Sequence, residues 1–434
     1  SLPAGFSFAA VNLSTFVLSF VAVAASYLAL RELDFGRRAS LMGAGLVLVN
    51  PAFVLLTYSY MTDVPFLAWF TLATWAYLRG LRREDLRWLA GGSVFSTVAV
   101  MIRQNGVVLP AALGAYLGWQ WLRGRRPFPW AEGLAGLELP IAAPAALAGL
   151  AGLGALAQFQ QPLDLPYVGT WRTMPYYPAV WSIYGTGSQG EWLAGTREML
   201  FSYRFWAAVT ALSCAGAGLL LWPAMRAGWQ ALRGGRAGEG PAAGAWRDWP
   251  AGFLTLSLAA YLAPILRFKG EIYERYLIGL LLPAGALILR AASRARARLR
   301  WPPFAALALI FLAFSLALTA EFVAWNGAAW RAAGRLAAEG VPLDHIDGGF
   351  AWNGWHFAGQ IGQGGQTPEA GAPAYRELTP WIDREYVVSF SPAEGYHVAD
   401  LEPYWSPLRR EQQELFILRR GELDMERIHG CNCQ

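Results

Sequence analysis

Residues 57–66 read Thr-Tyr-Ser-Tyr-Met-Thr-Asp-Val-Pro-Phe and form a short polar break between two long apolar runs. Asp63 in this break is the only acidic residue between Asp34 and Glu84. A carboxylate at the edge of a bilayer is costly, and membrane proteins that keep one usually use it. Further along the chain, Arg103-Gln104-Asn105 interrupts the apolar pattern in the same way. The two breaks therefore mark the first candidates for a functional site.

The composition places the chain in a membrane. Hydrophobic residues make up 55% of its 434 residues and charged residues 15%, whereas a soluble domain carries about 25% charged residues. A membrane-spanning helix needs roughly 20 apolar residues. On that criterion the sequence predicts a multi-pass α-helical membrane protein with spans at 8–30, 41–57, 64–80, 86–102, 106–122, 135–157, 204–224, 250–266, 275–291 and 302–321.

The arginines predict the direction of these spans. They are concentrated in alternate loops, and the positive-inside rule assigns such loops to the cytoplasm. The breaks at 57–64, 103–106 and 267–275, the segment 158–203 and the C-terminal part would then all face outside. We therefore expect an inner (cytoplasmic) membrane protein whose C-terminal domain is extracytoplasmic.

The sequence divides into two predicted domains. Residues 1–321 form the transmembrane domain, with 158–203 as an external loop rich in aromatic residues and proline. Residues 322–434 form a small soluble α/β domain, with a helix at 321–339 and strands at 385–390 and 414–419. The acidic character of this second domain argues against nucleic-acid binding.

The predicted outer face gathers the polar residues that suit chemistry on a lipid phosphate. Arginine and lysine bind phosphate, and Lys269 is the only lysine of the chain. A carboxylate such as Asp63 can accept the proton of an attacking hydroxyl. The candidate residues are Asp63 for catalysis, Arg103, Arg267, Lys269 and Arg275 for a donor phosphate, and Thr62, Gln104, Asn105, Glu191, Glu271 and Glu274 for the substrate.

Structural interpretations compete with each of these roles. Asp63 could simply cap the helix that begins at Val64, and Arg103 could be an arginine that extends its charge to the membrane interface. The 267–275 cluster could be a solvated loop with local ion pairs. Asp344, His345, Asp347 and His356 fit no standard metal spacing. The sequence thus indicates no cofactor, although it leaves a divalent metal open.

Several short motifs resemble a known family. Met61-Thr62-Asp63-Val64-Pro65-Phe66, following Asn50-Pro51, resembles membrane glycosyltransferases of the GT-C superfamily. The similarity is greatest to family 39, the protein-mannosyltransferase and aminoarabinose-transferase type. Glu274-Arg275-Tyr276-Leu277 resembles another stretch of that family. The resemblance implies a polyprenyl-phosphate sugar as donor, a glycan, lipid or protein as acceptor, and Asp63 as an acid near both.

One departure from the family affects the catalytic assignment. The family usually carries its main catalytic acid in the first external loop, and by the predicted topology that loop would end at or before Ser1. We therefore expect the general base either upstream of Ser1, in an N-terminal part missing from this sequence, or at Asp63, Asp164 or Glu191.

The sequence favours a membrane glycosyltransferase that acts at the outer face. The alternative is a transporter or flippase for a polyprenyl lipid or a small solute, which would share the spans and the polar cavity. A charged or unwound segment at the membrane midplane, common in transporters, is not apparent in the sequence. A third possibility is an assembly protein whose outer domain binds a partner.

Overall fold

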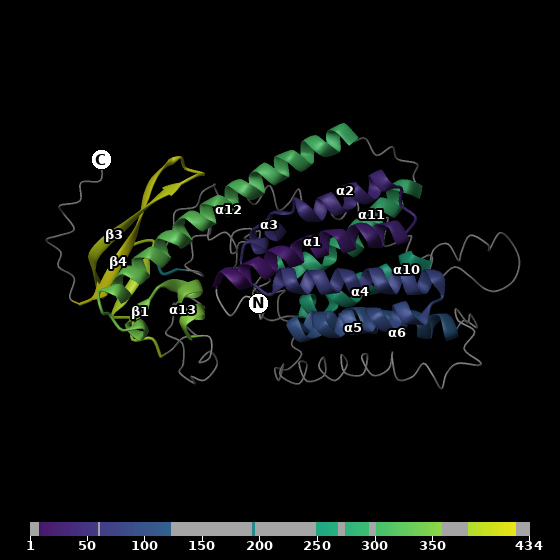
Figure 1. Cartoon of the computed structure of the whole chain (residues 1–434), viewed down its shortest axis with the longest axis horizontal. Helices are drawn as coiled ribbons and strands as arrows, with labels where there is room; N and C mark the ends of the chain where they lie inside the picture. Colours follow the sequence, from purple (N-terminus) through teal and green to yellow (C-terminus); the bar gives the residue numbers. More distant parts are fainter. Residues whose placement is uncertain are drawn as a thin grey trace, which may run out of the picture. The chain divides into compact units, whose positions relative to one another are not determined.

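The computed structural model describes residues 8–59, 61–122, 193–195, 249–267, 274–294, 301–357 and 381–421. The chain forms two compact units. The described part of the first is helical, and the second combines helices with a small sheet (Figure 1). The predicted class, mostly helical with a small α/β part, is confirmed at this level. The predicted spans at 135–157 and 204–224 lie outside the described residues.

Each predicted span that lies in the described residues is helical. The helices of the first unit are α1 (Phe8–Glu32), α2 (Arg37–Leu48), α3 (Pro51–Thr57), α4 (Asp63–Arg83), α5 (Leu86–Ile102), η2 (Gln104–Val107), α6 (Val108–Leu122), α10 (Trp249–Arg267), η5 (Glu274–Leu280), α11 (Leu281–Arg294) and the beginning of α12 (Trp301–Ala338). Among the described residues, two segments are long and apolar enough to cross a membrane, Ala10–Glu32 and Phe304–Ala338. The count of ten spans stays a prediction.

The predicted span at 41–57 is broken at Pro51. This segment forms α2 and α3, which are bent by 65° relative to each other and together are long and apolar enough for one broken span. Pro51 lacks a backbone N–H and disfavours a helical residue before it, so α2 ends and α3 starts anew with Asn50 as its cap. The break frees the carbonyl of Val49, which accepts a hydrogen bond of 3.0 Å from the Ser315 hydroxyl of α12. The bend is therefore compatible with an apolar environment.

Helices α4 and α5 form a tight antiparallel hairpin. The turn consists of Glu84, in the left-handed region at φ 53°, and Asp85, whose carboxylate caps α5. The two helices approach closely because Gly92 has no side chain. A Cβ at this position would lie 2.5 Å from the Tyr77 ring. At 1.5 Å per residue the helices are about 32 and about 26 Å long. The start of α4 and the end of α5 therefore lie at the same end of the hairpin.

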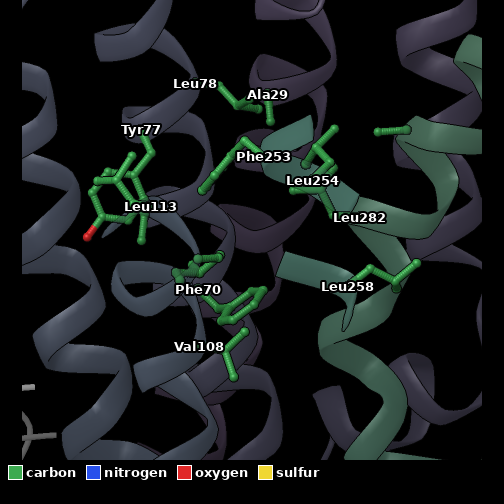
Figure 2. Packing of buried hydrophobic residues seen from close by; sticks show 14 of the residues in the cluster. Ala29, Phe70, Tyr77, Leu78, Val108, Leu113, Phe253, Leu254, Leu258 and Leu282 are labelled. Carbon is green, nitrogen blue, oxygen red and sulfur yellow. The ribbon is translucent and has the colours of Figure 1, made fainter. Parts of the chain in front are cut away.

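Aromatic side chains fill the space between the helices of the first unit. Phe253 of α10 contacts Tyr77 and Tyr116 edge-on, with ring centroids 6.2 and 6.5 Å apart. Figure 2 shows Phe253 close to Leu254 and Leu78 in this cluster. Because lipid tails are as apolar as these side chains, close packing rather than exclusion of water holds such helices together.

The second unit contains a four-stranded sheet with the order β1-β2-β4-β3. Its elements are the rest of α12, η6 (Leu343–His345), β1 (Ile346–Asp347), α13 (Gly349–Phe357), β2 (Tyr386–Ser389), β3 (Tyr396–Ser406) and β4 (Glu411–Arg420). The pair β1–β2 is parallel and the other pairs are antiparallel. The predicted strands at 385–390 and 414–419 are confirmed as β2 and β4.

Helix α12 packs on this sheet through both apolar and polar contacts. Trp325 meets Phe390 edge-on at 5.1 Å. The buried carboxylate of Glu321 accepts a hydrogen bond of 2.7 Å from the Ser406 hydroxyl at the end of β3. The helix predicted at 321–339 is thus the continuation of α12. Contacts divide the chain within α12, after Ser315, and the domain limits 1–321 and 322–434 stay a prediction.

Candidate functional site

Asp63 is the first residue of α4, and its side chain is only 1% exposed. Its carboxylate accepts a hydrogen bond from the guanidinium of Arg103 and forms an ion pair with it. The cap position of α4 belongs to Thr62, which makes no side-chain capping hydrogen bond, and Asp63 lies in the first turn. The ion pair with Arg103 gives Asp63 a contact beyond the capping role of the alternative interpretation.

Arg103 is positioned by the tight turn between α5 and η2. Its backbone is extended, with φ −146° and ψ 134°, and its carbonyl accepts a 2.9 Å hydrogen bond from the Gly106 N–H. A Cβ on Gly106 would lie 2.5 Å from the backbone nitrogen of Val100, so only glycine lets this turn lie against α5. The Ser96 hydroxyl adds a 3.0 Å hydrogen bond to the Gly106 carbonyl. The turn thereby fixes the position from which Arg103 reaches α4.

The pair has an asymmetric exposure that bears on its chemistry. The Arg103 side chain is 21% exposed, whereas Asp63 is closed off. A carboxylate in the first turn of a helix is favoured by the helix dipole, and the adjacent arginine compensates its burial. A ligand can therefore reach Arg103 directly, with Asp63 behind it, and an arginine held in this way suits a phosphate.

A third component, Tyr261 of α10, was not found from the sequence. It is 2% exposed, and its hydroxyl shares a hydrogen bond with the Asn105 side chain and one with the Gly279 backbone. The charges of Asp63 and Arg103 also act on it. The signal in the sequence is weak, because Tyr261 is one aromatic residue in an otherwise apolar run. The cluster formed by Asp63, Arg103, Asn105 and Tyr261 is called the polar cluster below.

The other candidates are distributed unevenly around the polar cluster. Thr62 and Gln104 are exposed at the two breaks. Arg267 ends α10, and Glu274 and Arg275 begin η5, which packs against α3, α4 and α10; the positions of these three side chains are not among the described features. Lys269, Glu271 and Glu191 lie outside the described residues.

Three of the four residues considered for a metal have other contacts. His345 Nδ1 lies 3.0 Å from Glu385, and Asp347 accepts a 2.9 Å hydrogen bond from Asn353. His356 lies against Trp352, with ring centroids 4.2 Å apart. Within the described ranges, no group of three or more His, Cys, Asp or Glu side chains is arranged to hold a metal ion.

The comparison with known protein families agrees with the resemblance inferred from the motifs. Residues 3–147 match the family described as dolichyl-phosphate-mannose-protein mannosyltransferase. This region, about a third of the chain, contains Asp63, Arg103 and Asn105. The chain is also similar to the apo crystal structure of ArnT from Cupriavidus metallidurans, with 14% identity, a TM-score of 0.39, and coverage of 94% of this chain and 83% of that chain. A comparison with curated proteins found no match.

The family match confirms the resemblance to the protein-mannosyltransferase type over residues 3–147. It supports a membrane glycosyltransferase of the GT-C type. Asp63, Arg103 and Asn105 of the polar cluster lie at or next to helix ends, in the two polar breaks that the sequence marked.

Proposed function

We propose that this chain is a membrane glycosyltransferase that moves a sugar from a polyprenyl-phosphate donor to an acceptor at the outer face of the cytoplasmic membrane. The observation that carries the proposal is the buried Asp63–Arg103 pair, which lies within the region that matches the family. The acceptor is a glycan, a lipid or a protein.

In the proposed reaction, a hydroxyl oxygen of the acceptor forms a bond to the anomeric carbon of the sugar. The bond from that carbon to the phosphate oxygen breaks, and polyprenyl phosphate leaves with the electron pair. A carboxylate takes the hydroxyl proton, which contributes roughly 10²- to 10⁴-fold to rate in such reactions. Attack from the side opposite the phosphate inverts the anomeric configuration.

Each residue of the proposed site has a separate part. Arg103 binds the donor phosphate, together with the cations Arg267, Lys269 and Arg275 of the 267–275 segment. The phosphate then competes with Asp63 for the Arg103 guanidinium, which frees the carboxylate to accept the proton. Thr62, Gln104, Asn105, Glu191, Glu271 and Glu274 line the path of the sugar and the acceptor.

This proposal is tested with two variants, Asp63→Asn and Lys269→Ala, in membranes that contain the native acceptor. A panel of radiolabelled polyprenyl-phosphate sugars is supplied, and labelled acceptor is measured at equal amounts of folded protein. We expect Asp63→Asn to lower transfer about 100-fold or more, and Lys269→Ala to raise the KM for the donor. Wild-type transfer by both variants would remove the site assignment.

The same membranes separate this function from transport. A flippase would move the labelled lipid between leaflets without forming a new glycosidic bond. Transbilayer movement in the absence of any labelled product, across the whole panel of sugars, would therefore favour the transporter. An assembly protein would instead lose its function when residues 322–434 are deleted and would tolerate Asp63→Asn.

A further inference from the structure

Tyr261 touches three segments that are distant in the sequence. It belongs to α10, its hydroxyl shares a hydrogen bond with Asn105 in η2, and the same hydroxyl is hydrogen-bonded to the backbone of Gly279 in η5. Its ring meets Phe70 of α4 edge-on, with centroids 5.7 Å apart. A single side chain thus joins the turn that positions Arg103 to the helix that follows the 267–275 segment.

Gly279 shows how close this contact is. A Cβ at that position would lie 2.5 Å from Cε2, 2.7 Å from Cζ and 2.7 Å from the hydroxyl oxygen of Tyr261. The backbone of η5 therefore lies directly on the ring, without an intervening side chain. Since η5 begins with Glu274 and Arg275, the contact sets the distance between two segments that carry candidate phosphate ligands.

We propose that Tyr261 is a positioning residue for the polyprenyl-phosphate donor, an inference that rests on the function proposed above. Its hydroxyl holds Asn105, and with it the turn of Arg103, at a fixed place relative to η5. Arg103 is then held at a fixed place relative to the backbone of η5, where it meets the phosphate group. Tyr261 acts through these two segments and needs no contact with the substrate.

The simpler explanation is that Tyr261 only fills the core. If the ring only fills space, its hydroxyl matters only because a buried hydroxyl must be hydrogen-bonded. Removal of the oxygen would then change the stability of the protein and leave donor binding unchanged. Tyr77 provides the matched comparison. It belongs to the same core cluster and is 0% exposed, and its hydroxyl shares hydrogen bonds with Ser93, at 3.2 Å, and with Ser96. Its hydroxyl thus joins α4 to α5, whereas that of Tyr261 joins η2 to η5. The two tyrosines differ in what their hydroxyls hold.

Tyr261→Phe and Tyr77→Phe are compared in the full chain, reconstituted in lipid nanodiscs. Binding of radiolabelled polyprenyl phosphate is the first readout, because this part of the donor does not depend on the sugar. A misplacement of about 1 Å in a well-ordered site can cost on the order of 100-fold in rate, and we expect a smaller loss in the affinity for the phosphate alone. We expect Tyr261→Phe to weaken binding on the order of 10-fold, and Tyr77→Phe to bind as the wild type. Thermal unfolding measures the stability change of each variant.

A double substitution tests the route of the effect. If Tyr261 acts through Asn105, the loss of affinity in Asn105→Ala/Tyr261→Phe is no greater than in the more severe single variant. Wild-type affinity in Tyr261→Phe, an equal loss in Tyr77→Phe, or additive losses in the double variant would each overturn the inference. Arg103→Ala is measured in parallel. Wild-type binding by Arg103→Ala counts against the proposed site, whereas loss in Arg103→Ala with normal Tyr261→Phe counts against the role of Tyr261 alone.

Discussion

The two ends of the α4–α5 hairpin carry ion pairs of very different kinds. Near the turn, Arg79 and Arg82 of α4 bind Glu32 and Asp34, at or just after the end of α1, with distances of 2.7 to 3.5 Å. At the opposite end, one buried carboxylate, Asp63, pairs with Arg103. The first group is a network with several partners, and the second is a pair whose members come from two breaks in the apolar pattern.

The neighbours of each group show what the difference means. Arg79 also lies over the ring of Trp88, with its guanidinium carbon 4.4 Å from the ring centroid. The ion pairs of Arg79 and Arg82 with Glu32 and Asp34, called the turn-end network below, thus connect α1 with α4. Because each arginine has more than one contact, the network suits a structural role at the surface. The polar cluster instead joins η2, α4, α10 and η5. Convergence of distant segments on a buried charge is typical of a functional site.

The largest difference between the two ends should appear on removal of one arginine. Arg103→Met leaves Asp63 as a buried charge without this partner, and we expect a loss of about 3–5 kcal/mol in the free energy of unfolding. Arg82→Met at the turn end should cost about 1 kcal/mol or less, because its side chain is 40% exposed. Chemical denaturation in detergent measures both.

A double variant checks the cause of that loss. Asp63→Asn/Arg103→Met removes the buried negative charge together with the arginine, so it should recover much of the stability lost in Arg103→Met. Equal stability losses for Arg103→Met and Arg82→Met would contradict the contrast drawn between the two ends.

A smaller effect is expected from the turn that positions Arg103. Gly106→Ala places a Cβ against the backbone of α5 and should cost about 1–3 kcal/mol through overpacking, with reduced sugar transfer. Gly114→Ala in α6 is the control, because a Cβ there meets nothing within 4 Å. Thermal unfolding and the transfer assay distinguish the two. Equal behaviour of both variants would show that the turn tolerates displacement.

The smallest expected effect concerns the exposed ion pairs of the second unit, which resemble the turn-end network in their redundancy. The hydrogen bond to Glu385 raises the pKa of His345, and the same bond lowers the pKa of Glu385. The bond between Asp383 and Arg420 lowers the pKa of Asp383. Each shift adds stability in a defined range of pH.

The sign of the pH dependence follows from these directions. The contribution of His345 is complete below its ordinary pKa of 6.5 and is lost as the pH rises through its raised value. The contributions of Glu385 and Asp383 are present at neutral pH and are lost as the pH falls through their lowered values. We expect hydrogen exchange in β1 and β2 to become faster as the pH rises above 6.5, after correction for the intrinsic rate. His345→Gln should flatten this limb, and an unchanged slope would contradict the assignment.

Much of the helical fold could be predicted from the sequence because the apolar runs are long. The sequence located α1, α4 and α5, and the polar breaks marked both Asp63 and Arg103. Pro51 marked a break in the span 41–57, but the sequence did not give the angle between α2 and α3, because the apolar pattern continues on both sides of the proline. The sequence also gave no signal for β3, which contains Pro403 and in which Asp400 and Trp405 are exposed.

The candidate site was only partly predictable. Asp63 and Arg103 are charged residues in apolar surroundings, so each stands out alone. Tyr261 and Gly279 belong to apolar segments, and their role depends on contacts between α10, η2 and η5 that no local pattern encodes. Lys269 and Glu191 remain predictions from the sequence, since they lie outside the described residues.

The two-residue turn at Glu84 and Asp85 has a consequence for how the hairpin tolerates changes in length. Each residue added to a helix rotates everything beyond it by about 100° and advances it by about 1.5 Å. One residue inserted in α5 before Ser96 would turn Arg103 away from Asp63, and four would nearly restore its direction but displace it by about 6 Å. Asp63 and Arg103 therefore meet only when α4 and α5 keep their lengths. We expect the hairpin to tolerate substitutions far more readily than insertions.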